Sequence, residues 1–292
     1  MLSVVLVFLF SFLPSVHAES LLVTVVLSED GGAYQAFSDS LRNKLQNSRV
    51  ILSSQSIDDK PGGSGLYIAV GMKAATELAA RDVPTLNVLV PKAGYDKLLR
   101  ASAQHAKPRS AIYLDQPMER QVALLLAALP GTRNVGVLYS SPPPELQAAH
   151  RLFADRNVNL HDRAIDASQS LNDALEIILK ESEVLFVLAD AEVYNAGTIR
   201  NILLTSYRKQ VPLIGISQAY VKAGALCAIY STPEQIAAQT IEAVRQFSET
   251  GKLPPSLYPK EFEVSVNTQV ARSLDIPIKG AASLREEIRG KP

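Results

Sequence analysis

Residues 21–53, LLVTVVLSEDGGAYQAFSDSLRNKLQNSRVILS, alternate between strand-like and helix-like segments. Leu21–Ser28 is an apolar run of strand length, and a segment with helical apolar spacing follows from about Tyr34 to Leu45. A second apolar run, Val50–Ser53, comes next. Strands that alternate with helices in this way predict a parallel sheet covered by helices.

The alternation continues along the chain in two similar series. Further strands are predicted at Leu66–Val70, Thr85–Val90, Ala111–Leu114, Val135–Tyr139, Asn159–Ile165, Val184–Ala189, Pro212–Ile216, Cys227–Ser231 and Phe262–Val266. Helices are predicted between them, among them one that runs from Ala191 to Tyr207. We therefore expect an α/β protein with two Rossmann-like lobes, each built on a parallel sheet and joined by hinge strands.

The expected lobes are not each continuous in sequence. Residues 19–114 and about 233–261 are predicted to form the first lobe, and residues 115–232 the second. Thr232-Pro233-Glu234-Gln235 combines a cap, a first-turn proline and an acceptor, so it predicts the start of a helix that returns to the first lobe. Residues 262–292 are predicted to make a third crossing and a C-terminal helix, and the sequence leaves open which lobe receives them.

The N-terminus resembles a secretory signal peptide. An apolar run from Leu2 to Leu13 precedes Val16 and Ala18, which suit the small-residue positions before a cleavage site. The run is shorter than the roughly 20 apolar residues of a membrane-spanning helix. We expect cleavage after Ala18, which makes residues 1–18 the signal peptide, and export to the periplasm.

Charge and cysteine content narrow the possible partners. Lys plus Arg and Asp plus Glu number 29 each, which leaves no net charge and disfavours nucleic acid as a partner. Cys227 is the only cysteine, so no intrachain disulfide can form. We expect Cys227 to be a small buried residue of a strand.

One segment raises the possibility of an enzyme. Gly215-Ile216-Ser217-Gln218-Ala219 follows a strand and approximates the elbow that presents a nucleophilic serine. The histidine base of an α/β-hydrolase follows the serine in sequence, whereas all four histidines here, the last being His161, precede Ser217. We expect no catalysis, and a serine hydrolase using Ser217 stays as the less favoured alternative.

No metal or cofactor is expected. The histidines His150 and His161 are too far apart in sequence to share a helical face, and no C-x-x-C pair exists. The glycine-rich segment 62–65 precedes a strand and lacks the Lys-Ser/Thr of a phosphate-binding loop, so we interpret it as a flexible turn.

Polar and aromatic residues recur at the carboxyl ends of the predicted strands, where open α/β sheets bind ligands. The candidate ligand-binding residues are Ser28, Glu29, Asp30, Gly32, Tyr34, Gly71, Met72, Asp190, Tyr194, Ser217 and Tyr220. Tyrosines supply flat apolar area with a polar tip, which suits a small organic ligand. An aspartate after a strand is also a common helix cap, and Tyr194 could equally be part of the core.

The sequence resembles the TrpX-like group of ABC-transporter substrate-binding proteins. The motifs that carry this resemblance are Leu203-Leu204-Thr205-Ser206-Tyr207-Arg208, Val211-Pro212-Leu213-Ile214-Gly215, Tyr220-Val221-Lys222-Ala223-Gly224-Ala225-Leu226, Tyr230-Ser231-Thr232-Pro233 and Phe262-Glu263-Val264-Ser265-Val266-Asn267-Thr268. The resemblance implies a type I periplasmic binding fold and a ligand, such as an amino acid, in the cleft between the lobes. The turn Ser28–Gly32 departs from the group's usual pattern.

The expected mechanism is capture of a small ligand by closure of the lobes about a hinge. Glu29 or Asp30 would pair with a ligand amine, Ser217 would donate to a carboxylate, and tyrosines would wall the cleft. The expected partners are the ligand and an ABC permease in the inner membrane, with the protein itself a monomer. A periplasmic sensor subunit that presents its closed form to a receptor is the alternative that the sequence does not separate.

Overall fold

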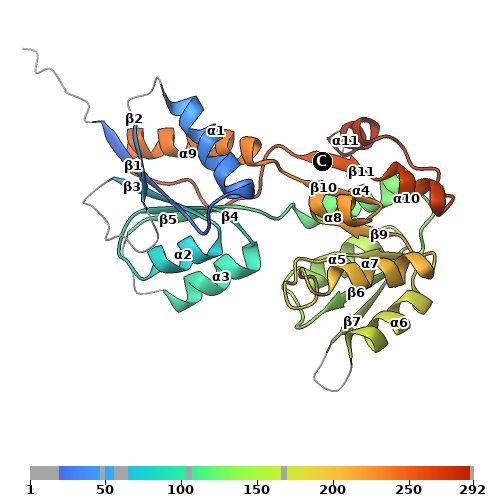
Figure 1. Ribbon diagram of the computed structural model, residues 1–292. Coiled ribbons are helices and arrows are strands. Elements are labelled where there is room, and N and C mark those ends of the chain that lie inside the picture. The colour runs from blue at the N-terminus through green and yellow to red at the C-terminus, as the bar shows by residue number, and fades with distance from the viewer. Residues whose placement is uncertain (1–19, 47–49, 56–64, 103–106, 166–169, 290–292) are drawn as a thin grey trace, which may run out of the picture.

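The computed structural model describes residues 20–46, 50–55, 65–102, 107–165 and 170–289, which fold into two lobes (Figure 1). The expected signal peptide and its cleavage site lie outside the described residues, as does most of the glycine-rich turn at 62–65. No helix among the described residues is long and apolar enough to cross a membrane.

The first lobe is built on a five-stranded sheet with the order β2-β1-β3-β4-β5, in which all neighbours are parallel. Its strands are β1 (Leu21–Leu27), β2 (Val50–Gln55), β3 (Leu66–Val70), β4 (Thr85–Val90) and β5 (Arg109–Tyr113). Its helices are α1 (Gly32–Leu45), α2 (Met72–Ala79), α3 (Lys92–Ala101) and α9 (Pro233–Thr250).

Helices cover both faces of this sheet, which explains why every residue of β3 is buried. Ile68 and Val70 pack with α1 and α9 on one face, and Tyr67 and Ala69 pack with α2 and α3 on the other. The alternation follows from the period of two along a strand. The return of α9 to the first lobe is visible in Figure 1, where it lies beside α1.

The second lobe is built on a six-stranded sheet with the order β11-β10-β9-β8-β6-β7. Its strands are β6 (Asn134–Tyr139), β7 (Asn159–Ala164), β8 (Val184–Phe186), β9 (Leu213–Gly215), β10 (Cys227–Tyr230) and β11 (Glu263–Val266). Its helices are α4 (Met118–Ala128), α5 (Leu146–Ala154), α6 (Leu171–Glu181), α7 (Ile199–Arg208), α8 (Gln218–Ala223), α10 (Thr268–Ser273) and α11 (Ala281–Arg289).

The C-terminal segment belongs to the second lobe, which settles the assignment that the sequence left open. Strand β11 pairs antiparallel with β10, from Cys227 opposite Val266 to Tyr230 opposite Glu263. Helix α11 then packs against α4, and its Leu284 is fully buried in the core that contains Cys227. Cys227 itself is fully buried, as predicted.

The predicted helix from Ala191 to Tyr207 is wrong in its first half, because α7 begins only at Ile199. Polar side chains satisfy the backbone groups of the preceding turns and compete with helical hydrogen bonds. The Asp190 carboxylate accepts from the backbone N–H groups of Glu192 and Val193 at 2.9 and 3.1 Å. The Thr198 hydroxyl donates to the carbonyl of Val193 at 2.6 Å.

Three crossings connect the lobes, and they are tied to one another by a buried polar network. The Gln116 amide, on the first crossing, donates to Ser231 Oγ at 2.8 Å on the second. Ser231 Oγ donates to the carbonyl of Glu261 at 2.5 Å on the third. Arg120 at the start of α4 donates to Gln116 Oε1 and to the carbonyl of Pro259, at 2.6 and 3.0 Å. The crossings therefore form one connected hinge instead of three independent linkers.

Candidate functional site

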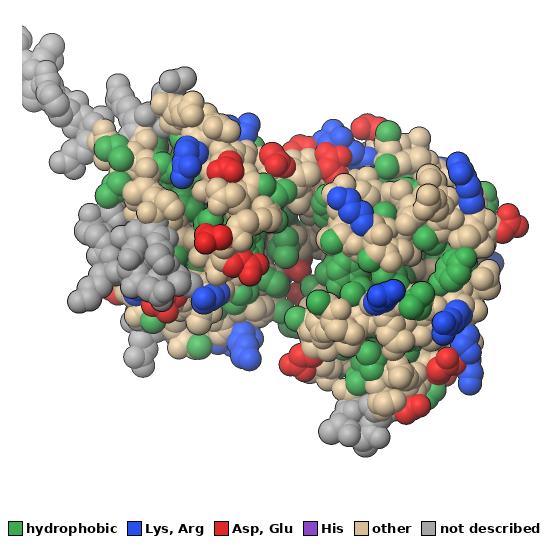
Figure 2. Space-filling view, in the orientation of Figure 1, with side chains coloured by type: hydrophobic (Ala, Val, Ile, Leu, Met, Phe, Trp, Pro, Cys, Tyr) green, Lys and Arg blue, Asp and Glu red, His purple; other side chains and the backbone are tan. Residues whose placement is uncertain are grey.

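The carboxyl edges of the two sheets face each other across the gap between the lobes. Lys92 comes directly after Pro91, which follows β4, and Glu145 lies between β6 and α5. Their side chains approach to 3.8 Å between Nζ and Oε1. Because all parallel strands of a sheet end at the same edge, this contact places both sets of strand ends on the interlobe side. Figure 2 shows the hollow that separates the lobes on one face of the molecule.

Three predicted residues come together at the edge of the first lobe. Gly71 has φ +86° and ψ 170°, and a Cβ there would lie 2.6 Å from Ser28 Oγ and 2.8 Å from Tyr34 Cζ. Ser28 Oγ accepts from the backbone N–H of Ala74 at 3.0 Å, which ties β1 to the first turn of α2. Only glycine fits at position 71, where the end of β3 lies against Ser28 at the end of β1.

The acidic residues of the first turn are exposed beside this contact. Glu29 and Asp30 are exposed, as is Gly32, and neither carboxylate forms an ion pair among the described residues. Burial raises the pKa of the Tyr34 hydroxyl, and the nearby Glu29 charge raises it further. Met72 is half-buried, and its thioether would lie 3.1 Å from a Cβ placed on Gly94. The turn thus presents negative charge next to aromatic and thioether surface.

Asp190 anchors the edge of the second lobe. Its Oδ2 accepts from the backbone N–H and the hydroxyl of Ser140 at 2.6 and 2.8 Å, directly after β6. Its Oδ1 accepts from the backbone N–H groups of Glu192 and Val193. Four hydrogen bonds engage this carboxylate, so its first role is to join the ends of β6 and β8.

The remaining candidates of the second lobe differ in accessibility. Tyr194 is only 5% exposed, and burial raises the pKa of its hydroxyl. Tyr220 is half-buried, and its hydroxyl donates to the carbonyl of Tyr194 at 3.3 Å. Its Cβ would lie 2.6 Å from a Cβ on Gly215, so the Tyr220 side chain sits over the end of β9. Ser217, the N-cap of α8, is half-buried and makes no side-chain capping bond.

A polar cluster that was not predicted from the sequence lies at the ends of β4, β5 and β6. The Lys92 backbone N–H donates to Asp115 Oδ2 at 2.5 Å, and Lys92 Nζ donates to Asp96 Oδ2 at 2.6 Å. Burial raises the pKa of Asp115, although the bond from Lys92 opposes the shift. Burial also raises the pKa of Tyr258, on the third crossing, to about 12. The strand-end rule that selected Gly71 also applies to Lys92 and could have found it.

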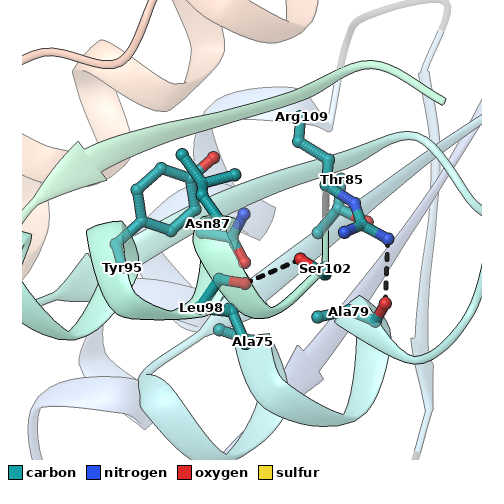
Figure 3. A pocket seen from close by; sticks show the side chains of 9 residues that line it. Ala75, Ala79, Thr85, Asn87, Tyr95, Leu98, Ser102 and Arg109 are labelled. Carbon is teal, nitrogen blue, oxygen red and sulfur yellow. Dashed lines mark hydrogen bonds between the residues drawn. The ribbon is translucent and has the colours of Figure 1, made fainter. Parts of the chain in front are cut away.

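The first lobe contains a small cavity that is a poor candidate for a ligand site. Figure 3 shows it between the sheet and α2–α3, with Asn87, Tyr95 and Arg109 among its lining side chains. Its volume is about 10 Å³, which is room for one water molecule. Pockets for organic ligands measure about 300–1,000 Å³. The space between the lobes is the better candidate.

The geometry around Ser217 lacks the features of a nucleophile elbow. Its backbone is extended, with φ −155° and ψ 165°, and carries none of the strain of such a turn. Of the histidines that the structure describes, His150 bonds to Asp162 and His161 to Asn134. Among the described residues, no cluster of three or more His, Cys, Asp or Glu side chains could hold a metal ion.

The protein has two α/β lobes with mainly parallel sheets, connected by three crossings, and the strand ends of the two sheets face each other. This is the type I periplasmic binding fold. A sequence model of the ABC transporter substrate-binding proteins matches residues 113–286, more than half of the chain. The chain belongs to this family. A search of curated proteins finds no match.

Solved structures share the fold at low sequence identity. An ABC domain from Streptococcus pneumonia in complex with L-Trp is 14% identical with a TM-score of 0.65, covering 91% of this chain and 98% of that one. A ligand-free, open substrate-binding protein with adhesive properties from Clostridium difficile is 15% identical with a TM-score of 0.67, covering 89% and 96%. A conserved domain protein from Vibrio cholerae is 19% identical with a TM-score of 0.65, covering 91% and 98%. These similarities establish the fold and do not assign a ligand.

Proposed function

We propose that the protein is an exported solute-binding component of an ABC importer. It captures a small organic ligand, such as an amino acid, between its lobes and delivers it to a permease in the inner membrane. The observation that carries the proposal is that the two strand-end edges face each other, with Lys92 Nζ on one lobe 3.8 Å from Glu145 Oε1 on the other. Family membership supports the binding role, because the matching family consists of substrate-binding proteins.

Each lobe contributes both polar groups and an aromatic side chain to the proposed site. On the first lobe, Glu29 or Asp30 pairs with a ligand amine, and Tyr34 packs against the ligand beside Gly71 and Met72. Among the described residues neither carboxylate has an ion-pair partner, so either one can bind the amine without giving up such a pair. Their charge also attracts a cationic group as it approaches the cleft.

On the second lobe, Ser217 donates to a ligand carboxylate and Tyr220 forms the aromatic surface. The Ser217 hydroxyl makes no capping bond, which leaves it available. Tyr194 lies in the core and supports Tyr220 through its carbonyl. Asp190 fixes the edge that carries both residues.

A thermal-shift screen of amino acids and other small metabolites tests the binding function. A ligand that binds only the folded protein raises the melting temperature in a dose-dependent way. Replacing Tyr220 with alanine should then weaken binding about tenfold or more, as expected for an aromatic side chain in a binding site. Tyr207→Ala is the control, since Tyr207 is 42% exposed at the far end of α7. Equal affinities of both variants and the wild type would contradict the site.

A further inference from the structure

Lys92 and Glu145 form a contact between the bodies of the two lobes. The side chains are 28% and 25% exposed, and the Nζ–Oε1 distance of 3.8 Å makes this a charge interaction without a direct hydrogen bond. The other ion pairs of the described residues lie within one lobe or involve the crossing segment at Lys260 and Glu261. A rotation of one lobe against the other changes the Lys92–Glu145 distance directly.

Lys92 is held in place on the side of the first lobe. Its ammonium is bonded to Asp96, one turn further along α3, at 2.6 Å. Its backbone N–H is bonded to Asp115, which lies on the first crossing. The cation is therefore fixed relative to the hinge and does not follow Glu145 freely when the second lobe moves.

Glu145 is held less tightly. Its carboxylate has Lys92 as its ion-pair partner and no side-chain hydrogen bond within the described part of the chain. The nearby Asp115 carboxylate carries the same charge and interacts unfavourably with Glu145. Removing the attraction to Lys92 therefore leaves repulsion between the first crossing and the second lobe.

We infer that the Lys92–Glu145 pair is an electrostatic catch that limits how far the ligand-free lobes separate. The pair favours arrangements with the lobes close together, so it raises the fraction of the empty protein that is near the ligand-retaining form. Only this link to affinity rests on the proposed function: apparent affinity scales with the binding-competent fraction. The effect on lobe separation itself does not require a ligand.

A distance measurement on the ligand-free protein tests the catch. Thr76→Cys on α2 and Ala154→Cys on α5 introduce exposed positions for spin labels, one on each lobe. The native Cys227 does not compete for label, because it is fully buried and burial raises its pKa to about 12. Pulsed electron paramagnetic resonance then gives the distribution of distances between the lobes.

Glu145→Gln should increase the ratio of longer to shorter distances about two- to fivefold, the size expected for a partly exposed ion pair. Lys92→Gln should increase it further, because the carboxylates of Asp96 and Asp115 then face Glu145 without the cation. Lys92→Arg keeps the charge and should retain the wild-type distribution. Lys209→Gln is the control, since it breaks the pair of Lys209 with Glu176, 2.7 Å apart within the second lobe.

Wild-type distance distributions in both Glu145→Gln and Lys92→Gln would overturn the catch. The same conclusion would follow if Lys209→Gln changed the distribution as much as Glu145→Gln. Neither result bears on ligand capture, which the thermal-shift screen tests separately. If the thermal-shift screen finds no ligand, the measured effect of the pair on lobe separation still stands.

Discussion

Replacing Gly71 with alanine perturbs the candidate site at the point where two strand ends meet. Gly71 adopts φ +86° and ψ 170°, a backbone region that is almost restricted to glycine. An alanine there costs about 1–3 kcal/mol in backbone strain. Its Cβ would also lie within 2.8 Å of atoms of Ser28 and Tyr34, which must both shift.

Gly31 offers a matched control for the backbone term. It precedes α1 as Gly71 precedes α2, with nearly the same conformation at φ 89° and ψ −173°. A Cβ on Gly31 would have no heavy atom within 4 Å. Gly31→Ala therefore introduces the backbone strain without a steric clash. The difference in free energy of unfolding between the two variants then measures the effect of the close contact of Gly71 with Ser28 and Tyr34.

We expect Gly71→Ala to lose about 1 kcal/mol more of the free energy of unfolding than Gly31→Ala. This is the typical value of one hydrogen bond, here the one that Ser28 accepts from Ala74. Urea unfolding of both variants measures the difference. Gly71→Ala should also weaken binding of a ligand from the thermal-shift screen about tenfold or more, because Ser28 and Tyr34 move. Equal stability losses with unchanged affinity would refute the close contact and its place in the site.

Three further predictions concern single side chains. Asp190→Asn should destabilise the second lobe by about 1–3 kcal/mol, since the amide cannot accept all four hydrogen bonds that the carboxylate receives, including two from Ser140. Urea unfolding measures this loss, and an unchanged unfolding midpoint would contradict it. Cys227 should not react with a thiol reagent at pH 8 in the native protein, because the thiol is buried and burial raises its pKa to about 12. It should react fully in denaturant, where it is exposed. Rapid labelling of the native protein would refute its burial. Burial and the bond to Asp162 raise the pKa of Tyr139 to about 12, so its contribution to stability is complete below pH about 10 and is lost as the pH rises toward 12. Circular dichroism of Tyr139→Phe should show that this part of the alkaline stability loss is absent. A loss identical to that of the wild type would count against the prediction.

The sequence predicted the architecture well because its signals are local. The capping sequence at Thr232 forms as predicted, with the Thr232 hydroxyl accepting from the Gln235 backbone and the Gln235 side chain accepting from the Thr232 backbone. The structure contains a second cap of this local kind, in which Ser170 Oγ accepts from the backbone N–H of Asp173 at the start of α6. These motifs act over three residues, so no tertiary information is needed to recognise them.

The predicted helix at 191–198 failed for the opposite reason. Asp190 and Thr198 satisfy backbone groups with their side chains, a competition that apolar periodicity does not register. The position of β11 depended on antiparallel pairing with β10, about which a single strand carries no signal. The sequence therefore left the lobe of the C-terminal segment undetermined.

The strand-end rule selected some residues that lie close together, and their role in binding stays a prediction. It selected Ser28, Tyr34 and Gly71, which the structure brings into contact. It could not distinguish the engaged carboxylate of Asp190 from a free one, because hydrogen bonds from Ser140 depend on tertiary structure. The pairing of Lys92 with Glu145 joins residues that are distant in sequence, so only the packing of the lobes reveals it.

Small-angle X-ray scattering with and without a ligand from the thermal-shift screen measures whether the two lobes close around the ligand. If the ligand binds between the lobes and is trapped by closure, the radius of gyration should fall when the ligand reaches saturation. A ligand that binds tightly while the radius of gyration stays constant would contradict capture by closure.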